Sequence, residues 1–177
     1  MSYDLTLFRV PEGADAAQTY HELLARQERE TGDLDSWLKR PVPEPVRAEM
    51  RRVADALKTW RPALEEFQPK SPLPWIELND EDLAVQFCIC ERTVGVTMPY
   101  FGERAQEMME CAAGCFEILN SLGGFVEYDP QLGRIVTTAD LGDMVAVYRR
   151  VDRELPGIVA GVRQSASAAA KPWWKVW

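Results

Sequence analysis

The sequence is poor in the residue types that most catalytic sites need. It has one histidine, His21, among 177 residues. His21 falls inside a predicted helix with no motif partner, and no Gly-x-Ser-x-Gly segment is present, so no nucleophile–base pair is indicated. The adjacent glycines Gly123 and Gly124 follow a predicted helix instead of opening one, which is the wrong side for a phosphate-binding loop. The residues therefore indicate no catalytic centre and no cofactor.

Long apolar runs and an excess of basic residues are also missing. No stretch approaches the roughly 20 apolar residues that a membrane-spanning helix needs, and residues 1–5 lack the basic and apolar regions of a signal peptide. Lys and Arg number 20 against 28 Asp and Glu, a net charge of −8, which disfavours binding to nucleic-acid phosphates. We expect a cytoplasmic protein that binds neither nucleic acid nor membrane.

The composition that remains is that of an ordinary globular protein with an uneven charge. Apolar residues make up 46% and charged residues 27% of the sequence, and the length suits one domain with a substantial core. Residues 155–177 hold three basic residues and no acidic ones, so they carry +3 and the rest of the chain carries −8 − 3 = −11. We predict a single α+β domain at 1–160, followed at 161–177 by a small-residue linker and a tryptophan-rich tail.

The spacing of apolar residues switches between the periods of strands and helices along the chain. Period-two alternation predicts strands at 3–9, 75–78, 83–89, 93–98, 125–128 and 134–137. Helical spacing predicts helices from Asp15 to about Thr31, over 45–59, in a short segment opened by Pro62, over 102–122, and from Asp140 to about 155. The order β-α-α-β-β-β-α-β-β-α predicts an α+β fold. We expect a mostly antiparallel sheet of about five or six strands in hairpins, with four or five helices mainly on one face.

The four cysteines form two pairs. Cys88 and Cys90 share one face of a predicted strand, and Cys111 and Cys115 lie one turn apart on a predicted helix. Four thiolates can hold zinc, but structural zinc sites generally use two-residue spacers instead of spacers of one and three. The apolar face of the strand is opposite to Cys88 and Cys90, so we expect the sheet to separate the two pairs. Core or surface thiols are the favoured interpretation, and a metal or redox site is the less favoured one.

Two segments are candidates for binding a partner. Trp173, Trp174 and Trp177 follow the predicted linker, and Asp80, Glu81 and Asp82 cluster at a predicted turn. Exposed tryptophans are costly in a monomer, so the tail either folds back on its own acidic body or docks on another protein, a second copy of this chain included. Carboxylates at turns generally cap the turn, but these three together with Asp129 also allow a small-molecule site.

Three segments resemble those of a group of uncharacterised bacterial proteins. They are residues 1–5, 96–100 and 123–131, and the Pro-Trp-Trp-Lys sequence at 172–175 extends the resemblance to the C-terminus. These motifs mark turns and strand ends, so the resemblance implies no chemistry. Small acidic proteins of this kind are similar in type to bacterial immunity proteins, which neutralise a toxin by binding it.

We therefore predict a non-catalytic protein that binds a protein partner, in an immunity-type or regulatory role. The acidic surface favours a basic partner, because opposite charge steers association. Two alternatives stay open: a small-molecule-binding domain or enzyme that uses carboxylates, and a cysteine-based metal or redox protein.

Overall fold

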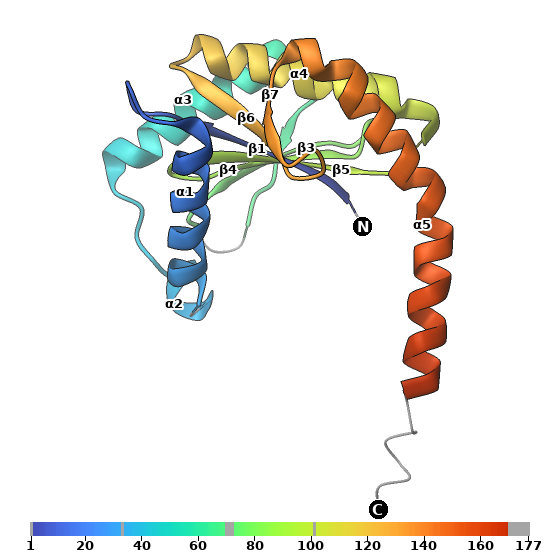
Figure 1. Ribbon diagram of the computed structural model, residues 1–177. Coiled ribbons are helices and arrows are strands. Elements are labelled where there is room, and N and C mark those ends of the chain that lie inside the picture. The colour runs from blue at the N-terminus through green and yellow to red at the C-terminus, as the bar shows by residue number, and fades with distance from the viewer. Residues whose placement is uncertain (1, 33, 70–72, 101, 170–177) are drawn as a thin grey trace, which may run out of the picture.

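The computed structural model describes residues 2–32, 34–69, 73–100 and 102–169, which form an α+β fold around one antiparallel sheet (Figure 1). The strands are β1 (Ser2–Arg9), β2 (Glu65–Glu66), β3 (Ile76–Asp80), β4 (Val85–Ile89), β5 (Thr93–Pro99), β6 (Phe125–Asp129) and β7 (Arg134–Val136). The α-helices are α1 (Ala16–Thr31), α2 (Leu34–Leu38), α3 (Glu44–Trp60), α4 (Ala105–Ser121) and α5 (Leu141–Ala169). The predicted fold class is confirmed, with a seven-stranded sheet where about five or six strands were expected.

The first strand occupies the centre of the sheet, whose order is β2-β3-β4-β5-β1-β6-β7. β1 pairs antiparallel with β5 from Ser2↔Pro99 to Phe8↔Thr93. On its other side, β1 pairs with the shorter β6 over four residues. Because β1 bonds to both neighbours, it joins the β3–β4–β5 meander and the β6–β7 hairpin into one sheet.

The helices divide between the two faces of the sheet (Figure 1). α3, α4 and the first part of α5 pack over the core face, which carries buried strand residues such as Leu5 and Phe87. On the opposite face, the ring of Tyr20 in α1 lies 5.6 Å from the Phe8 ring and stacks 3.7 Å from the Tyr128 ring, centroid to centroid. The helices therefore cover mainly one face, as predicted, and α1 buries an aromatic cluster on the other.

The two helix starts that the sequence marks with aspartate are both capped. The Asp15 side chain accepts a hydrogen bond of 2.8 Å from the backbone N–H of Gln18, and α1 begins after it. Before α5, Thr137 and Asp140 form a capping box around the 3-10 helix Thr138–Asp140, in which the Thr137 backbone N–H donates to Asp140 at 2.8 Å.

The segment after α3 corrects one prediction. The short helix expected at Pro62 is absent, and a turn leads instead into β2. Leu64 is buried, and Glu65 and Glu66 pair with Asn79 and Leu78 of β3. Edge-strand pairing and the burial of Leu64 thus outweigh the suitability of Pro62 for a first helical turn.

The C-terminal helix is longer than the sequence predicts. α5 continues to Ala169, so residues 161–169, assigned to a linker, are helical. Alanine is the best helix former, which explains why the small-residue run extends the helix. Pro156 lies inside α5, and Figure 1 shows that the helix bends and runs away from the sheet. Trp173, Trp174 and Trp177 lie outside the described residues. Within the described part of the chain, none of the helices combines the length and apolarity needed to cross a membrane.

The contact between α3 and α4 depends on a glycine, and it yields a prediction. A Cβ atom added at Gly114 would lie 2.6 Å from Cζ2 of the Trp60 ring. We expect Gly114→Ala to lower the free energy of unfolding by about 1–3 kcal/mol through overpacking, despite a helix-propensity gain of about 1 kcal/mol. Urea unfolding followed by circular dichroism measures the change.

The matched control is Gly142→Ala in the first turn of α5, where an added Cβ meets no atom within 4 Å. It should be neutral or slightly stabilising. Equal stability of the two variants would show that the helices do not depend on the close approach at Gly114.

Candidate functional site

The acidic cluster proposed for partner binding does not form one surface. Asp80, the last residue of β3, is 1% exposed and forms an ion pair with Arg61. Its second oxygen accepts the backbone N–H of Leu83 at 3.0 Å. Burial opposes ionisation of Asp80, but the Arg61 guanidinium and the Leu83 amide outweigh it and lower the pKa of the carboxyl group. Glu81 and Asp82 are exposed, so Asp80 is removed from the candidate binding residues.

Asp129 is also a structural carboxylate. It is fully buried and accepts a hydrogen bond from the Tyr3 hydroxyl. The backbone N–H groups of Gln131 and Leu132 donate to its other oxygen at 2.7 and 3.0 Å, which closes the β6–β7 turn. Three strands separate β3 from β6 in the sheet. Asp80 and Asp129 therefore do not converge on a shared catalytic site.

Glu127 is a buried carboxyl group that the sequence analysis missed. It is 2% exposed, and its Oε1 atom has no hydrogen-bond partner among the described residues. Burial, and then the nearby charge of Asp129, raise the pKa of Glu127 to about 8. The signal was present in the sequence, because Glu127 alternates with Phe125 and Asp129 on the core-facing side of β6.

The four cysteines lie as the strand and helix periods predict. Cys111 and Cys115 are buried in the core side of α4, whereas Cys88 and Cys90 lie on the opposite face of the sheet. The Sγ atoms of Cys88 and Cys90 are 3.8 Å apart and are not bonded. Within the described residues, no group of three or more His, Cys, Asp and Glu side chains is arranged to hold a metal ion. The sheet thus separates the pairs, and a four-thiolate zinc site is ruled out geometrically.

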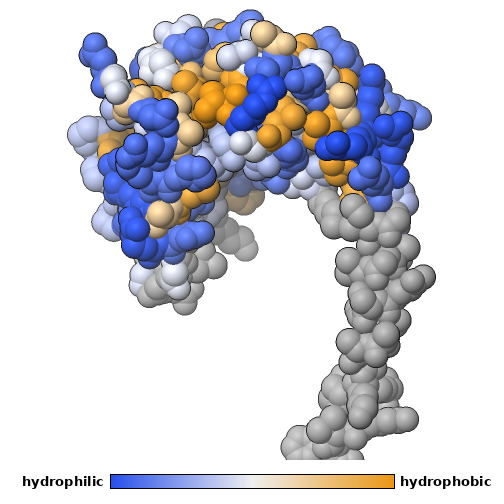
Figure 2. Space-filling view, in the orientation of Figure 1, coloured by the Kyte–Doolittle hydropathy of each residue, from blue (hydrophilic) through white to orange (hydrophobic). Residues whose placement is uncertain are grey.

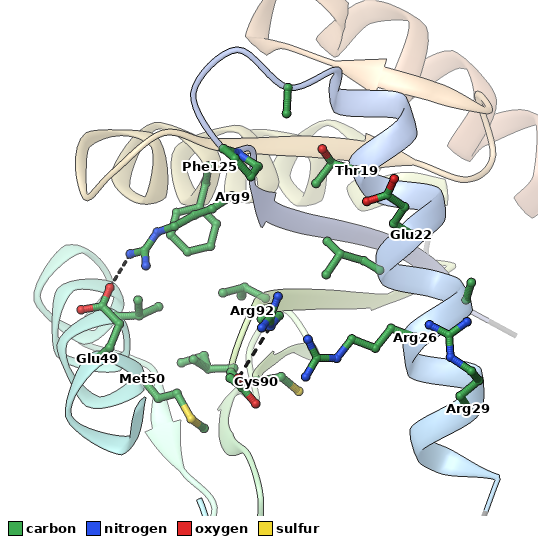
Figure 3. Close-up of a pocket in the computed structure, with 18 residues that line it drawn as sticks. Arg9, Thr19, Glu22, Arg26, Arg29, Glu49, Met50, Cys90, Arg92 and Phe125 are labelled. Carbon is green, nitrogen blue, oxygen red and sulfur yellow. Dashed lines mark hydrogen bonds and ion pairs between the residues drawn. The ribbon is translucent and has the colours of Figure 1, made fainter. Parts of the chain in front are cut away.

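A cleft of about 660 Å³ lies between α1, α3 and the turn that joins β4 to β5 (Figure 3). Its wall holds four arginines and three glutamates, an excess of one positive charge in a chain whose net charge is −8. We call it the arginine cleft, after Arg9, Arg26, Arg29 and Arg92. Apolar side chains, Met50, Val53 and Phe125 among them, line the remainder.

Arg9 holds the α3 side of the arginine cleft in place. As the last residue of β1, it lies with its guanidinium carbon 4.6 Å from the centroid of the Phe125 ring and forms an ion pair with Glu49 of α3. Arg52 binds the same carboxylate at 2.7 Å. Arg52 and Arg9 together lower the pKa of Glu49 to about 2 despite partial burial. Glu49 therefore stays ionised, and its ion pair with Arg9 occupies the Arg9 guanidinium.

Arg26 and Arg92 face each other across the opposite side of the cleft (Figure 3). Arg26 of α1 uses Nε for its ion pair with Glu30, at 2.5 Å. Arg92 in the β4–β5 turn also uses Nε, in a longer contact of 3.6 Å with Glu91. Among the described residues, the terminal nitrogens of these two guanidinium groups donate no hydrogen bond to a carboxylate, although the Glu91 charge also acts on Arg26. Arg29 is exposed at the rim on the same helix. These groups can bind an anionic group entering from solvent.

A second cavity of about 200 Å³ continues from the arginine cleft. We call it the side cavity. The two hollows share Leu23 and Arg26 of α1 and the β4–β5 turn residues 90–92. Beyond them the side cavity is lined by Trp37, whose ring stacks on Trp75 at 5.2 Å, and by Arg40. The hollows therefore form one continuous surface along α1.

His21 and the arginines illustrate what the sequence could not show. His21 is exposed on α1, with its ring 5.9 Å from that of Tyr20, and it does not line the arginine cleft. Arg26 and Arg29 lie three residues apart on α1, but Arg9 of β1 and Arg92 of the β4–β5 turn share no motif or spacing with them. Only the tertiary fold brings them together.

The buried Glu127 generates a prediction about pH. Its pKa in the folded chain is about 8, against an ordinary 4.5, so between these values the folded state binds more protons than the unfolded state. Stability linked to Glu127 is therefore greatest below pH 4.5 and falls as the pH rises towards 8. Glu127→Gln, which does not titrate, should match the wild type near about pH 5 and exceed it near about pH 9 by a few kcal/mol.

Urea unfolding at the two pH values measures this difference, and Glu117→Gln on the exposed side of α4 is the control. The control should differ from the wild type by the same amount at both pH values. A Glu127→Gln effect that does not change with pH would mean that Glu127 is ionised in the folded chain.

Comparison with known proteins adds no relative to this description. The chain matches no protein-family model, no curated protein and no solved structure. The function of the site therefore has to be inferred from its own geometry and charge.

Proposed function

We propose that this chain is a non-catalytic binding protein that holds an acidic segment of a partner protein in the arginine cleft. The observation that carries the proposal is the pair Arg26 and Arg92, which face each other with their terminal nitrogens open to a ligand. A guanidinium presents two parallel N–H groups to a carboxylate, and such charged bonds are among the strongest that a surface forms.

The shape of the site supports an extended occupant. The arginine cleft and the side cavity follow one face of α1, from Pro11 at one end to Trp37 and Arg40 at the other. Both apolar and cationic side chains line this length, and Phe125 and Trp37 offer rings for side-chain packing. An extended peptide that carries both acidic and apolar residues matches this lining better than a compact small molecule.

The overall charge opposes such a partner at long range. With a net charge of −8, the chain repels an acidic segment until short-range contacts form. We therefore expect modest affinity that depends on the direct arginine contacts.

The predicted basic partner stays a separate prediction. Of the three acidic residues predicted to bind a basic partner, Glu81 and Asp82 are exposed, whereas Asp80 is buried in its ion pair with Arg61. Binding through Trp173, Trp174 and Trp177, or pairing of two copies through this tail, also stays a prediction.

We place this binding role in the bacterial cytoplasm and regard an immunity-type or regulatory function as the class it suits. The four cysteines are free, which is the usual state in a reducing compartment. Binding without catalysis is what an immunity protein needs in order to block a toxin, and the motif resemblance points to bacteria. The bacterial cytoplasm and the immunity-type or regulatory role are proposals about where and why the chain binds. Binding in the arginine cleft can be tested directly.

The test is fluorescence anisotropy with a labelled peptide of alternating glutamate and leucine. We expect the wild type to bind it, and the double variant Arg26→Glu/Arg92→Glu to bind at least about tenfold more weakly, because each lost charged hydrogen bond contributes about 1.5–3 kcal/mol. The double variant Arg149→Glu/Arg150→Glu on the exposed side of α5 is the control. Both double variants change the net charge from −8 to −12.

A glutamine–leucine peptide and a lysine–leucine peptide complete the design. The proposal requires that neither binds as tightly as the glutamate peptide. If the two double variants weaken peptide binding equally, the loss of affinity reflects overall charge and not contacts in the arginine cleft. Tighter binding of the lysine peptide would overturn the acidic partner in favour of the basic one.

A further inference from the structure

Cys88 and Cys90 form a close dithiol on the outer face of the sheet. Cys88 lies within β4, and Cys90 is the first residue after that strand. Alternate residues of a strand point to the same side, which places the two Sγ atoms 3.8 Å apart. Both thiols are free. The arginine contacts that carry the proposed binding function do not involve the sulfur atoms of this pair.

The dithiol is accessible to small molecules. Both side chains are half-buried and line the side cavity of about 200 Å³. Cys111 and Cys115, by contrast, are buried under α4, where burial raises the pKa of each thiol. A reagent in solution therefore meets Cys88 and Cys90 first.

The surroundings of the pair favour Cys90 as the nucleophile, because the Arg40 charge and the Thr93 contact act on that thiol. The two thiols share a hydrogen bond in which either sulfur can be the donor. Against the effect of burial, the contact with Cys88, the hydrogen bond with Thr93 and the Arg40 guanidinium lower the pKa of Cys90. The same contact, with burial, raises the pKa of Cys88. Reactive cysteines are typically thiolates beside a positive charge, and Cys90 has that setting.

The backbone allows a bond between the two sulfurs. Alternate Cα atoms along a strand are about 6.6–6.8 Å apart, which is at the upper end of the range of about 4.4–6.8 Å found in disulfides. Cys90 lies at the start of the β4–β5 turn, beyond the last residue of β4, and its backbone N–H donates to the Thr93 carbonyl at 2.8 Å. A disulfide near the limit of this range is more easily reduced than a structural one.

We propose that Cys88 and Cys90 form a reversible intrachain disulfide by exchange with a small-molecule disulfide such as oxidised glutathione. The Cys90 thiolate attacks one sulfur of glutathione disulfide, forms a mixed disulfide and releases one glutathione thiolate. Cys88 then loses its proton and attacks Sγ of Cys90, which releases the second glutathione. The protein dithiol is oxidised, the glutathione disulfide is reduced to two glutathione molecules, and the proton of Cys88 passes to a released thiolate.

The thiol chemistry does not depend on the proposed binding function, although Cys88 and Cys90 line the side cavity that the proposed partner segment occupies. Two sulfurs, with no third cysteine, histidine or carboxylate grouped for metal binding in the described residues, suit a disulfide better than a zinc site. Cys90 lies in the wall that the side cavity shares with the arginine cleft, so oxidation of the pair is a change at the edge of that cleft.

The test equilibrates the full chain with glutathione redox buffers, blocks the remaining thiols and maps tryptic peptides by mass spectrometry. Residues 71–92 and 105–134 fall in separate tryptic peptides, which carry the β4 pair and the α4 pair respectively. We expect the first peptide to lose the mass of two hydrogen atoms in oxidising buffer and to regain it on return to reducing buffer. The second peptide should stay fully reduced as an internal control.

Single variants separate the roles of the two thiols. Cys88→Ser should accumulate a stable glutathione adduct on Cys90, because no second thiol resolves it. The Cys90→Ser variant should react with glutathione disulfide at least about tenfold more slowly than the Cys88→Ser variant, since its remaining thiol, Cys88, is the less ionised of the two. Four free thiols in the wild type at every buffer ratio, a stable adduct in the wild type, or oxidation confined to the α4 peptide would each overturn the proposal. The wild-type peptide map decides the matter even where a variant fails to fold.

Discussion

The pairing of β1 with both β5 and β6 is the constraint on which the rest of the structure depends. Without β1 the meander β3–β4–β5 and the hairpin β6–β7 would share no hydrogen bonds. The register of this strand places Tyr3 against Asp129 in the core and brings Arg9 to the end of the sheet, where it binds Glu49 of α3. The arginine cleft opens at that end, because α1 leaves β1 there and returns along the opposite side. One central strand thus positions the core, the Tyr3–Asp129 and Arg9–Glu49 contacts, and the candidate site.

Buried carboxyl groups show how differently the fold treats the same chemistry. Asp80 has a guanidinium and a backbone amide, and Asp129 has a tyrosine hydroxyl and two amides. These groups replace the water that each carboxylate loses, so burial fixes two turns of the sheet at little cost. Glu127 has no such compensation at Oε1, and it adapts through a raised pKa instead. A neutral side chain in the core is the cheaper state, which is why this residue makes stability depend on pH.

The sequence predicted the structure correctly where the local spacing of apolar residues determines which segments form strands and which face each residue occupies. Alternation located the long strands, and it correctly placed Cys88 and Cys90 on the face of the sheet opposite to Cys111 and Cys115. It failed at Pro62, where pairing with β3 overrides a local helix signal, and at 161–169, where alanine extends a helix through an expected linker. The arginine cleft could not be predicted, because Arg9, Arg26 and Arg92 are far apart in sequence and share no spacing. Their convergence depends on strand order and on the path of α1, which are tertiary properties.

The charge of the arginine cleft is opposite to the net charge of the chain. Figure 2 shows hydrophilic residues over much of the visible surface, with apolar residues gathered between α1 and α5, and the arginine cleft is a small cationic site within an acidic chain. The most direct measurement is a nuclear magnetic resonance titration of the full chain, labelled with ¹⁵N, with the glutamate–leucine peptide, read at the arginine Nε–Hε signals. If the arginine cleft binds the peptide, we expect saturable shifts at Arg26 and Arg92 and none at Arg149 and Arg150. Shifts of equal size at all four arginines, or none at any of them, would contradict this expectation.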